Sequence, residues 1–362
     1  MESPAPSNSA SGSRRCRSPA CVAQEGLVRI RKKQGSLSVR VTRQRRLWTF
    51  AAAIALYLGS MASASTQTCT VSMTAMAFGN ADALSGAAQD ATATITLTCT
   101  GGSGGAGGQR MCVSIGAGSA NDATSRQLTG PSSNHARFDL YTDSARSILW
   151  GSWQTGYDTA GLQVDAPRNT TTNVTVYGRF FGSQPTIVPG SYTSTFTANP
   201  FIRYDDKAGI ACPTGGFTAS TSTSATATVT STCNISTTAL NFGTASLLTS
   251  NIDATGTISA QCSNTLPYSI GLNSGSNASG SQRRMKPGSA SFINYNLYTD
   301  SGRTSAWATT TSATSCTGGA GTCVTGTGTG STQSIVVYGR VPAQSSPVVG
   351  TYTDTVVVTV TF

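Results

Sequence analysis

Two side chains on which many enzymes and helices depend are nearly absent from this chain. Glutamate occurs only at Glu2 and Glu25, and His135 is the only histidine among 362 residues. Without glutamate, later segments lack a common solvent-facing residue of amphipathic helices. A lone histidine with no nearby acid or thiol pattern does not indicate a general base. We therefore expect an all-β protein that is not an enzyme, with His135 in a loop.

No apolar run in the sequence is long enough to cross a membrane as a helix. One run, residues 47–58, follows three arginines and precedes the small residues 62–64. This order is typical of a secretory signal, here cleaved after Ala64. The residues ahead of it are either a long start of that signal or the product of a start codon placed too early, and we prefer the second. Residues 1–64 are thus predicted to be an extension and signal peptide of an exported protein.

The excess of positive charge lies in this leader. Residues 1–64 hold eleven of the 24 basic and two of the 14 acidic residues, which leaves 13 and 12 after cleavage. The formal net charge of +10 therefore does not describe the mature protein. Binding to nucleic-acid phosphates needs a basic surface, so we expect no nucleic-acid partner.

The chain is rich in repetition. Seven landmarks occur twice and in the same order: Cys69 and Cys233, Phe78-Gly79 and Phe242-Gly243, Cys99 and Cys262, Arg110-Met111 and Arg284-Met285, Tyr141-Thr142-Asp143 and Tyr298-Thr299-Asp300, Val176-Tyr177-Gly178-Arg179 and Val337-Tyr338-Gly339-Arg340, Gly190-Ser191-Tyr192 and Gly350-Thr351-Tyr352. The sequence therefore predicts two copies of one domain. Domain 1 spans residues 65–217 and domain 2 spans residues 218–362, each an ordinary single-domain size.

The local pattern within each copy is that of strands. Apolar residues alternate with Thr or Ser along residues 93–99 and again along residues 256–262. A period of two is typical of half-buried antiparallel strands. Glycine-rich stretches at 101–108 and 325–332 are not followed by Gly-Lys-Ser/Thr, so they are hairpin loops rather than phosphate-binding loops. We predict a β-sandwich in each domain.

Cysteines indicate disulfides rather than metal binding. Eight remain after the leader: Cys69, Cys99, Cys112, Cys212, Cys233, Cys262, Cys316 and Cys323. An even number in an exported chain predicts disulfides, and without a CxxC pair or clustered histidines zinc is the weaker alternative. Equivalent positions favour Cys69–Cys99 and Cys233–Cys262. A short loop would be closed by Cys316–Cys323, which leaves Cys112–Cys212, although four cysteines in each domain allow three pairings.

The last residues of the chain alternate strictly. One face of residues 351–362 carries Tyr352, Val356, Val358, Val360 and Phe362. If this is the final strand of domain 2, its neighbouring groove lacks a covering strand and presents an exposed edge.

Domain 1 differs at the corresponding place. After its matching strand the chain continues through residues 217–233, where Ala225, Ala227 and Val229 alternate with Thr. This stretch either completes domain 1 from within or forms a stiff linker, and the sequence leaves both open.

The ordered landmarks resemble those of the spore coat protein U domain family, as a tandem pair over nearly all of residues 66–362. The resemblance implies immunoglobulin-like β-sandwiches, the second incomplete and completed by donor-strand complementation, in subunits of archaic chaperone-usher pili that serve biofilm formation. It implies a periplasmic pilus chaperone, an outer-membrane usher and an adjacent pilin that donates a strand as partners. It implies no cofactor, and secretion through the periplasm to the cell surface.

Cleavage after Ala64 would leave only residues 65–68 before Cys69. A donor strand needs about ten residues at about 3.3 Å each to fill a groove. The chain is therefore expected to accept a strand without donating one. In this it resembles the two-domain tip adhesin of Csu-type pili, and the resemblance implies an abiotic or host surface as its target. The alternative is a structural shaft or coat-like subunit with a longer N-terminal extension.

Surface binding is expected from apolar residues of domain 1 loops. The candidates are Ile148, Leu149, Trp150, Trp153, Phe180 and Phe181. Exposed apolar clusters mark interaction sites. Trp150 has a counterpart in Trp307, which favours a core position for it, whereas Leu149 and Trp153 have none and are the better candidates.

Two further pairs have structural interpretations. Asp143 and Asp300 occur at the same place in both domains, each followed by Ser, which indicates turn-capping side chains rather than catalytic acids. Arg110 and Arg284 are expected to pair with a carboxylate or backbone carbonyl at a strand end. A secreted carbohydrate-active enzyme is thereby disfavoured, and hydrolysis lost on Asp143→Asn would revive that alternative.

Overall fold

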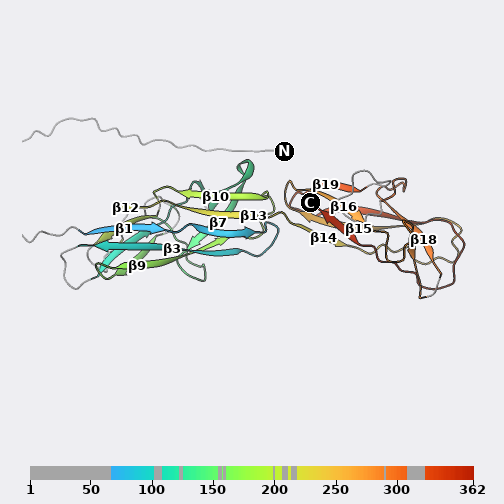
Figure 1. Cartoon of the computed structure of the whole chain (residues 1–362), viewed down its shortest axis with the longest axis horizontal. Helices are drawn as coiled ribbons and strands as arrows, with labels where there is room; N and C mark the ends of the chain where they lie inside the picture. The colour runs from blue at the N-terminus through green and yellow to red at the C-terminus, as the bar shows by residue number, and fades with distance from the viewer. Residues whose placement is uncertain are drawn as a thin grey trace, which may run out of the picture. The chain divides into compact units, whose positions relative to one another are not determined.

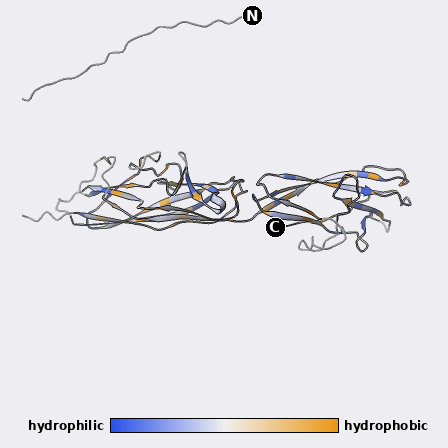
Figure 2. Ribbon diagram, turned by 90° about the horizontal axis from the view of Figure 1, so that it is seen from above, coloured by the Kyte–Doolittle hydropathy of each residue, from blue (hydrophilic) through white to orange (hydrophobic). Residues whose placement is uncertain are grey.

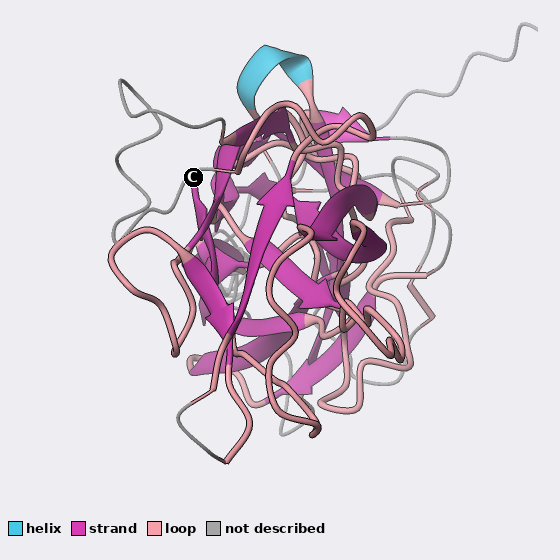
Figure 3. Cartoon of the chain, turned by 90° about the vertical axis from the view of Figure 1, so that its right-hand side faces the viewer, coloured by secondary structure: helices cyan, strands magenta, loops and turns pink. Residues whose placement is uncertain are grey.

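The computed structural model describes the chain from residue 67 onward with internal gaps. The described residues are 67–101, 108–121, 125–153, 157, 160–198, 200–205, 211–212, 218–288, 291–307 and 323–362. The predicted leader and signal peptide lie outside them. Strands make up all of the regular structure in this part of the chain except one 3-10 turn, Pro131–Ser133 (Figure 3). The prediction of an all-β protein is confirmed.

Domain 1 is a sandwich of two sheets (Figure 1). The larger sheet has the order β1-β3-β9-β7-β6-β10-β13-β2, with β5 beside β6. Its strands are β1 (Thr68–Met73), β2 (Met76–Ala81), β3 (Gln89–Thr100), β5 (Ala120–Asn121), β6 (Arg126–Thr129), β7 (His135–Tyr141), β9 (Thr171–Phe180), β10 (Gly190–Phe196) and β13 (Thr223–Val229). The smaller sheet has the order β12 (Ala219–Ser220), β11 (Phe201–Asp205), β4 (Gln109–Ser114), β8 (Leu162–Ala166).

His135 opens strand β7 and pairs with Thr129 of β6. The prediction that it lies in a loop was therefore wrong, because the tight β6–β7 connection ends just before it.

Domain 2 repeats this plan with fewer strands. One sheet has the order β14 (Cys233–Thr237), β15 (Ile252–Cys262), β20 (Gln333–Val341), β18 (Ile293–Tyr298), β17 (Arg283–Met285). The other has the order β19 (Val324–Thr327), β16 (Pro267–Leu272), β21 (Val358–Thr361). The tandem immunoglobulin-like sandwiches expected from the sequence are confirmed.

One of the seven sequence landmarks was matched wrongly. Arg110-Met111 lies in β4 of the smaller sheet, whereas Arg284-Met285 lies in β17, which pairs with β18. The true counterpart of β17 is β6, because Arg126 and Arg283 both donate to the backbone carbonyl of the twin tryptophan, Trp150 or Trp307. The error arose because β6 carries Leu128 where β17 carries methionine.

The cores follow the alternation read from the sequence (Figure 2). Ile95 and Leu97 of β3 are fully buried, and Ile258 and Ala260 of β15 occupy the equivalent positions. Burial of Ile95, Leu97 or Ile258 contributes about 1.5–3 kcal/mol each. The spacing of two along a strand therefore places one face of each sheet in the core.

Disulfides join equivalent strands in the two domains. Cys69–Cys99 links β1 to β3 and Cys233–Cys262 links β14 to β15, each with a Cα–Cα distance of 4.0 Å. Cys112–Cys212 closes a third bridge with a Cα–Cα distance of 5.7 Å. These three predicted pairs are confirmed. The predicted pair Cys316–Cys323 involves Cys316, which lies outside the described residues.

Candidate strand-accepting groove

In domain 1, strand β13 fills the space between β10 and β2. It pairs antiparallel with β10, where Tyr192 faces Ala227 and Ser194 faces Ala225, and parallel with β2. The inward side chains Ala225, Ala227 and Val229 are at most 4 % exposed. Residues 223–229 therefore complete domain 1 from within, which decides between the two interpretations of this stretch. The sheet of domain 1 thus extends past residue 217.

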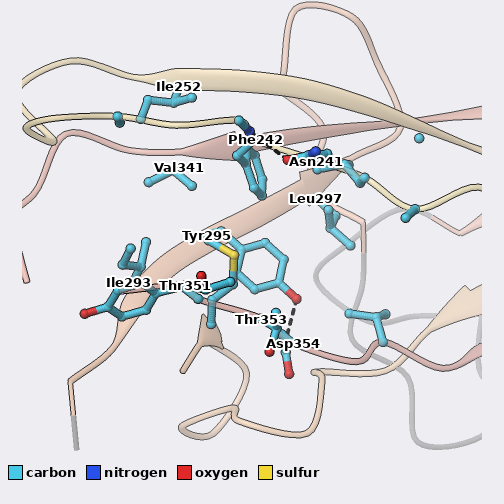
Figure 4. Close-up of a pocket in the computed structure, with 18 of the residues that line it drawn as sticks. Asn241, Phe242, Ile252, Ile293, Tyr295, Leu297, Val341, Thr351, Thr353 and Asp354 are labelled. Carbon is cyan, nitrogen blue, oxygen red and sulfur yellow. Dashed lines mark hydrogen bonds between the residues drawn. The ribbon is translucent and has the colours of Figure 1, made fainter. Parts of the chain in front are cut away.

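Domain 2 has no strand at the corresponding place among the described residues. The counterparts of β2 and β10, residues 240–245 and 350–356, form no regular strands, and only Thr353 makes an isolated bridge, to Lys286. Between them lies a groove with a volume of about 1030 Å³ (Figure 4). Its apolar lining includes Leu240, Phe242, Ile252, Ile258, Leu272, Met285, Ile293, Leu297, Val337, Val341, Val356 and Val358. Apolar side chains thus line much of the groove where a strand would cover it.

Equivalent side chains differ in burial in the way that a missing strand predicts. Met76 and Phe78 on β2 are 1 % and 3 % exposed, whereas their counterparts Leu240 and Phe242 are only half-buried. On the opposite wall, Tyr192 of β10 is buried and its counterpart Tyr352 is half-buried. Strand β13 accounts for the difference, because it covers these residues in domain 1.

The segment 350–357 is held along one edge only. Asn273 N donates to Val357 O at 3.1 Å and Ser276 N donates to Thr355 O at 3.0 Å. The edge that in domain 1 pairs with β13 has no partner strand in the described part of domain 2. This edge offers backbone donors and acceptors to an incoming strand.

The predicted contact residues at the chain end divide into two groups. Tyr352, Val356 and Val358 line the groove. Val360 pairs with Ile270 in the second sheet, and Phe362 is 53 % exposed and does not line the groove. The sequence suggested one continuous strand, but the chain leaves the groove wall and joins β16 at Val358.

A polar cluster interrupts the apolar wall of the groove. Tyr295 Oη donates to Asp354 Oδ2 at 2.7 Å (Figure 4), and Asn277 N donates to Asp354 Oδ1 at 3.1 Å. Burial, followed by the hydrogen bond to Asp354, raises the pKa of Tyr295 above its usual value. Both side chains line the groove, so the surface that would receive a strand includes a carboxylate.

The proposed surface-binding residues are not all at the surface. Trp150 and Phe180 are 0 % and 1 % exposed and belong to the core of domain 1, so the inclusion of these two was wrong. Their large rings pack inside, and the Trp150 Nε1–H donates to Val113 O. Leu149, Trp153 and Phe181 are half-buried. Ile148 is 60 % exposed.

Asp143 and Asp300 cap their own loops, as predicted. Each carboxylate accepts hydrogen bonds from backbone N–H groups four and five residues on, for Asp143 those of Ser147 and Ile148. These bonds hold the pKa of both aspartates below the usual value. The carboxylates are therefore engaged in structure.

Arg110 and Arg284 also bind as predicted. Arg110 forms a two-bond ion pair with Asp165, and Arg284 donates to the backbone carbonyls of Asn277 and Ala278.

A buried charged cluster in domain 1 was missed by the sequence analysis. Arg126 is fully buried and donates to Asp139 at 2.9 Å and to backbone carbonyls of Ile115, Gly116 and Trp150. The Tyr157 hydroxyl donates to the same carboxylate at 2.8 Å. Burial raises the pKa of Asp139 and lowers that of Arg126. The alternation of β7 gave no signal for this cluster, because it places Asp139 on the face of the exposed His135 and Arg137, although Asp139 is 3 % exposed.

The described residues were also compared with what a metal site and a membrane-spanning helix need. They include no group of three or more His, Cys, Asp or Glu side chains that could hold a metal ion. No helix long and apolar enough to cross a membrane occurs among them.

The fold and the groove define a class: a tandem β-sandwich protein in which one domain is closed by its own strand and the other is open to a strand. A family model for the spore coat protein U domain matches residues 56–199 and 219–359. The chain belongs to this family, in two tandem copies. It is 34% identical over 136 residues to Protein U of Myxococcus xanthus, which covers 34% of this chain and 71% of that protein.

Solved structures that are similar include those of two tip subunits. One is a CsuC-CsuE chaperone-tip adhesion subunit pre-assembly complex of Acinetobacter baumannii Csu pili, with 20% identity, a TM-score of 0.47 and coverage of 82% of this chain and 100% of that chain. The other is the CupB6 tip adhesin of Pseudomonas aeruginosa, with 10% identity, a TM-score of 0.35 and coverage of 82% and 93%.

Proposed function

We propose that this protein is a secreted subunit of a chaperone-usher pilus and that domain 2 accepts a β-strand from an adjacent subunit. One observation carries the proposal: β13 fills domain 1 between β2 and β10, while the same place in domain 2 is an apolar groove. Strand addition to an exposed edge supplies main-chain hydrogen bonds together with side-chain pockets. Both are available along residues 350–357.

Such a groove needs a partner at every stage. Before assembly, a periplasmic chaperone would cover the apolar lining, which otherwise invites aggregation. At an outer-membrane usher, the strand of the adjacent pilin would replace the chaperone. The finished fibre would lie at the cell surface.

A position at the fibre tip is the finer part of the proposal. Domain 1 is closed by its own β13 and needs no donor, so it is free to face outward. Its exposed Ile148 replaces the polar Ser305 of domain 2 and is the leading contact for an abiotic or host surface in biofilm formation. Cleavage after Ala64 would leave no donor strand. A shaft subunit remains the second candidate.

The proposal is tested by closing the groove within the chain. A copy of residues 219–231 is attached after Phe362 through a Gly/Ser linker, which repeats the connection of β11 to β13 in domain 1. We expect this variant to be more stable than the unaltered chain, monomeric without a chaperone, and absent from surface fibres. The matched control carries the same tail with Ala225, Ala227 and Val229 of the copy changed to Asp.

Assembly of the closed variant into fibres at the normal level would contradict strand acceptance by domain 2. N-terminal sequencing of the surface protein separates the tip from the shaft. A start at Ser65 fits the tip, and a start far upstream, with an extension able to insert into another subunit, fits the shaft.

A further inference from the structure

Equivalent buried arginines, Arg126 and Arg283, have different partners in the two domains. In domain 1, Arg126 pairs with Asp139 on the neighbouring strand β7. In domain 2, Arg283 is 3 % exposed and donates to the carbonyls of Leu272, Asn273 and Trp307. The counterpart of Asp139 is the neutral Asn296. A buried guanidinium without a nearby carboxylate is costly, so domain 2 needs its countercharge elsewhere.

Asp354 is the acid of domain 2 whose charge acts against the burial of Arg283. Residues 230–362 contain three acids, Asp253, Asp300 and Asp354. Asp253 is paired with Arg303 and Arg340, and Asp300 caps its own loop. Burial lowers the pKa of Arg283, and the charges of Tyr295 and Asp354 act against this lowering.

Asp354 occupies a position that faces inward in the completed domain. Its counterpart is Ser194, which is fully buried on β10. Gly118 and Gly275, with φ of +90° and +87°, lie directly beside Ser194 and Asp354, where an added Cβ would collide with either side chain. The Asp354 carboxylate is therefore held in the groove wall by Tyr295 and Asn277, and Gly275 leaves room for it.

The pairing of domain 1 identifies what faces this position. Ser194 lies opposite Ala225 of β13, and Ala225 is fully buried. Side chains directly opposite on paired strands have Cβ atoms about 4.5–5.5 Å apart. A donor strand seated like β13 therefore places one side chain against the Asp354 carboxylate.

From this placement we infer that Asp354 determines specificity for the donor strand: it requires a small residue without negative charge at the position equivalent to Ala225. A second carboxylate there would be desolvated next to the first, and like charges on opposed strands destabilise pairing. The fully buried Ala225 shows that the completed sandwich of domain 1 holds a small side chain at this position. The inference rests on the proposed function.

The test uses the full-length chain and a labelled synthetic peptide of residues 219–232, the chain's own strand. Three peptides are compared by fluorescence anisotropy: the unaltered one, Ala225→Asp, and the control Thr226→Asp. Thr226 points outward on β13, so its substitution adds the same charge away from the groove. We expect Kd to rise at least tenfold for Ala225→Asp and less than threefold for Thr226→Asp.

The protein variant D354N completes the cycle. It should reduce the Ala225→Asp penalty to less than threefold. Equal penalties at positions 225 and 226 on the unaltered chain would overturn the inference, and this comparison needs no folded variant. A penalty that D354N leaves unchanged would also overturn it. Failure of the unaltered peptide to bind would overturn the proposed function itself, so the two failures are distinguishable.

Discussion

At the residue scale, the buried charge of Arg126 is the most demanding feature of domain 1. A guanidinium removed from water is stable only when its carboxylate and carbonyl partners are all in place. Arg126 has Asp139, three carbonyls and the ring of Tyr157 at 4.2 Å. Loss of the carboxylate would leave the positive charge inside the core.

We therefore predict that Asp139→Asn lowers the free energy of unfolding of domain 1 by about 3–5 kcal/mol, the cost of breaking a buried ion pair. Urea unfolding measures it. The control is Asp165→Asn, whose carboxylate is 46 % exposed beside Arg110 and should cost about 0–1 kcal/mol. Equal losses in free energy of unfolding for the two variants would show that the buried pair contributes no more to stability than the exposed one.

Acid should weaken the exposed ion pair between Asp90 and Arg179. The hydrogen bonds from Arg179 hold the pKa of Asp90 below its usual value. Its contribution is thus complete above the unfolded-state pKa of about 3.9 and is lost as the pH falls through the lower folded-state pKa. Replacing Asp90 by Asn should cost less than about 1 kcal/mol at neutral pH, because the pair is exposed. The difference should shrink progressively as the pH falls below about 3.9, as measured by urea unfolding across pH.

At this scale the sequence predicted interactions within short motifs. It did not predict the buried ion pair of Arg126 and Asp139, which joins two strands. The caps Asp143 and Asp300 follow from local sequence, because each carboxylate binds backbone only four or five residues away. Asp139 meets Arg126 from another strand. Such a contact depends on strand pairing, which the sequence did not provide.

At the element scale, β13 is the strand that domain 1 has and that the described part of domain 2 lacks. Its inward residues Ala225 and Ala227 are small and at most 4 % exposed, so they lie in a filled core. We predict that Ala225→Leu overpacks this space and lowers the free energy of unfolding of domain 1 by about 1–3 kcal/mol. Urea unfolding is again the measurement.

The matched control for that substitution is Thr226→Leu, which adds an apolar side chain on the exposed face of the same strand. It should change stability by about 0.5 kcal/mol or less. If both variants unfold alike, β13 does not seat against the core in the register described.

Strands with strong alternation were predictable and β13 was not. The β3 and β15 patterns place aliphatic residues at every second position. Residues 223–229 show the same period, but Ala and Thr suit an exposed linker equally well. Only the pairing with β2 and β10, distant in sequence, decides the matter. The break at Val358 likewise depends on β16.

At the scale of the whole molecule, domain 1 serves as the completed form with which domain 2 can be compared. Domain 1 shows the sandwich with the strand in place, and domain 2 shows the same sandwich with a groove there. The repeat, the sandwiches and an open second domain were all expected from the sequence. The wall residues were expected only in part, because Val360 and Phe362 turn away from the groove.

The central claim is that domain 2 is incomplete until it receives a strand. Hydrogen–deuterium exchange of backbone amides in the full chain tests it most directly, with and without the peptide of residues 219–232. We predict fast exchange along 351–357 without the peptide and strong protection with it, while β10 of domain 1 is protected in both. Equal protection of 351–357 and β10 without any added strand would contradict the account.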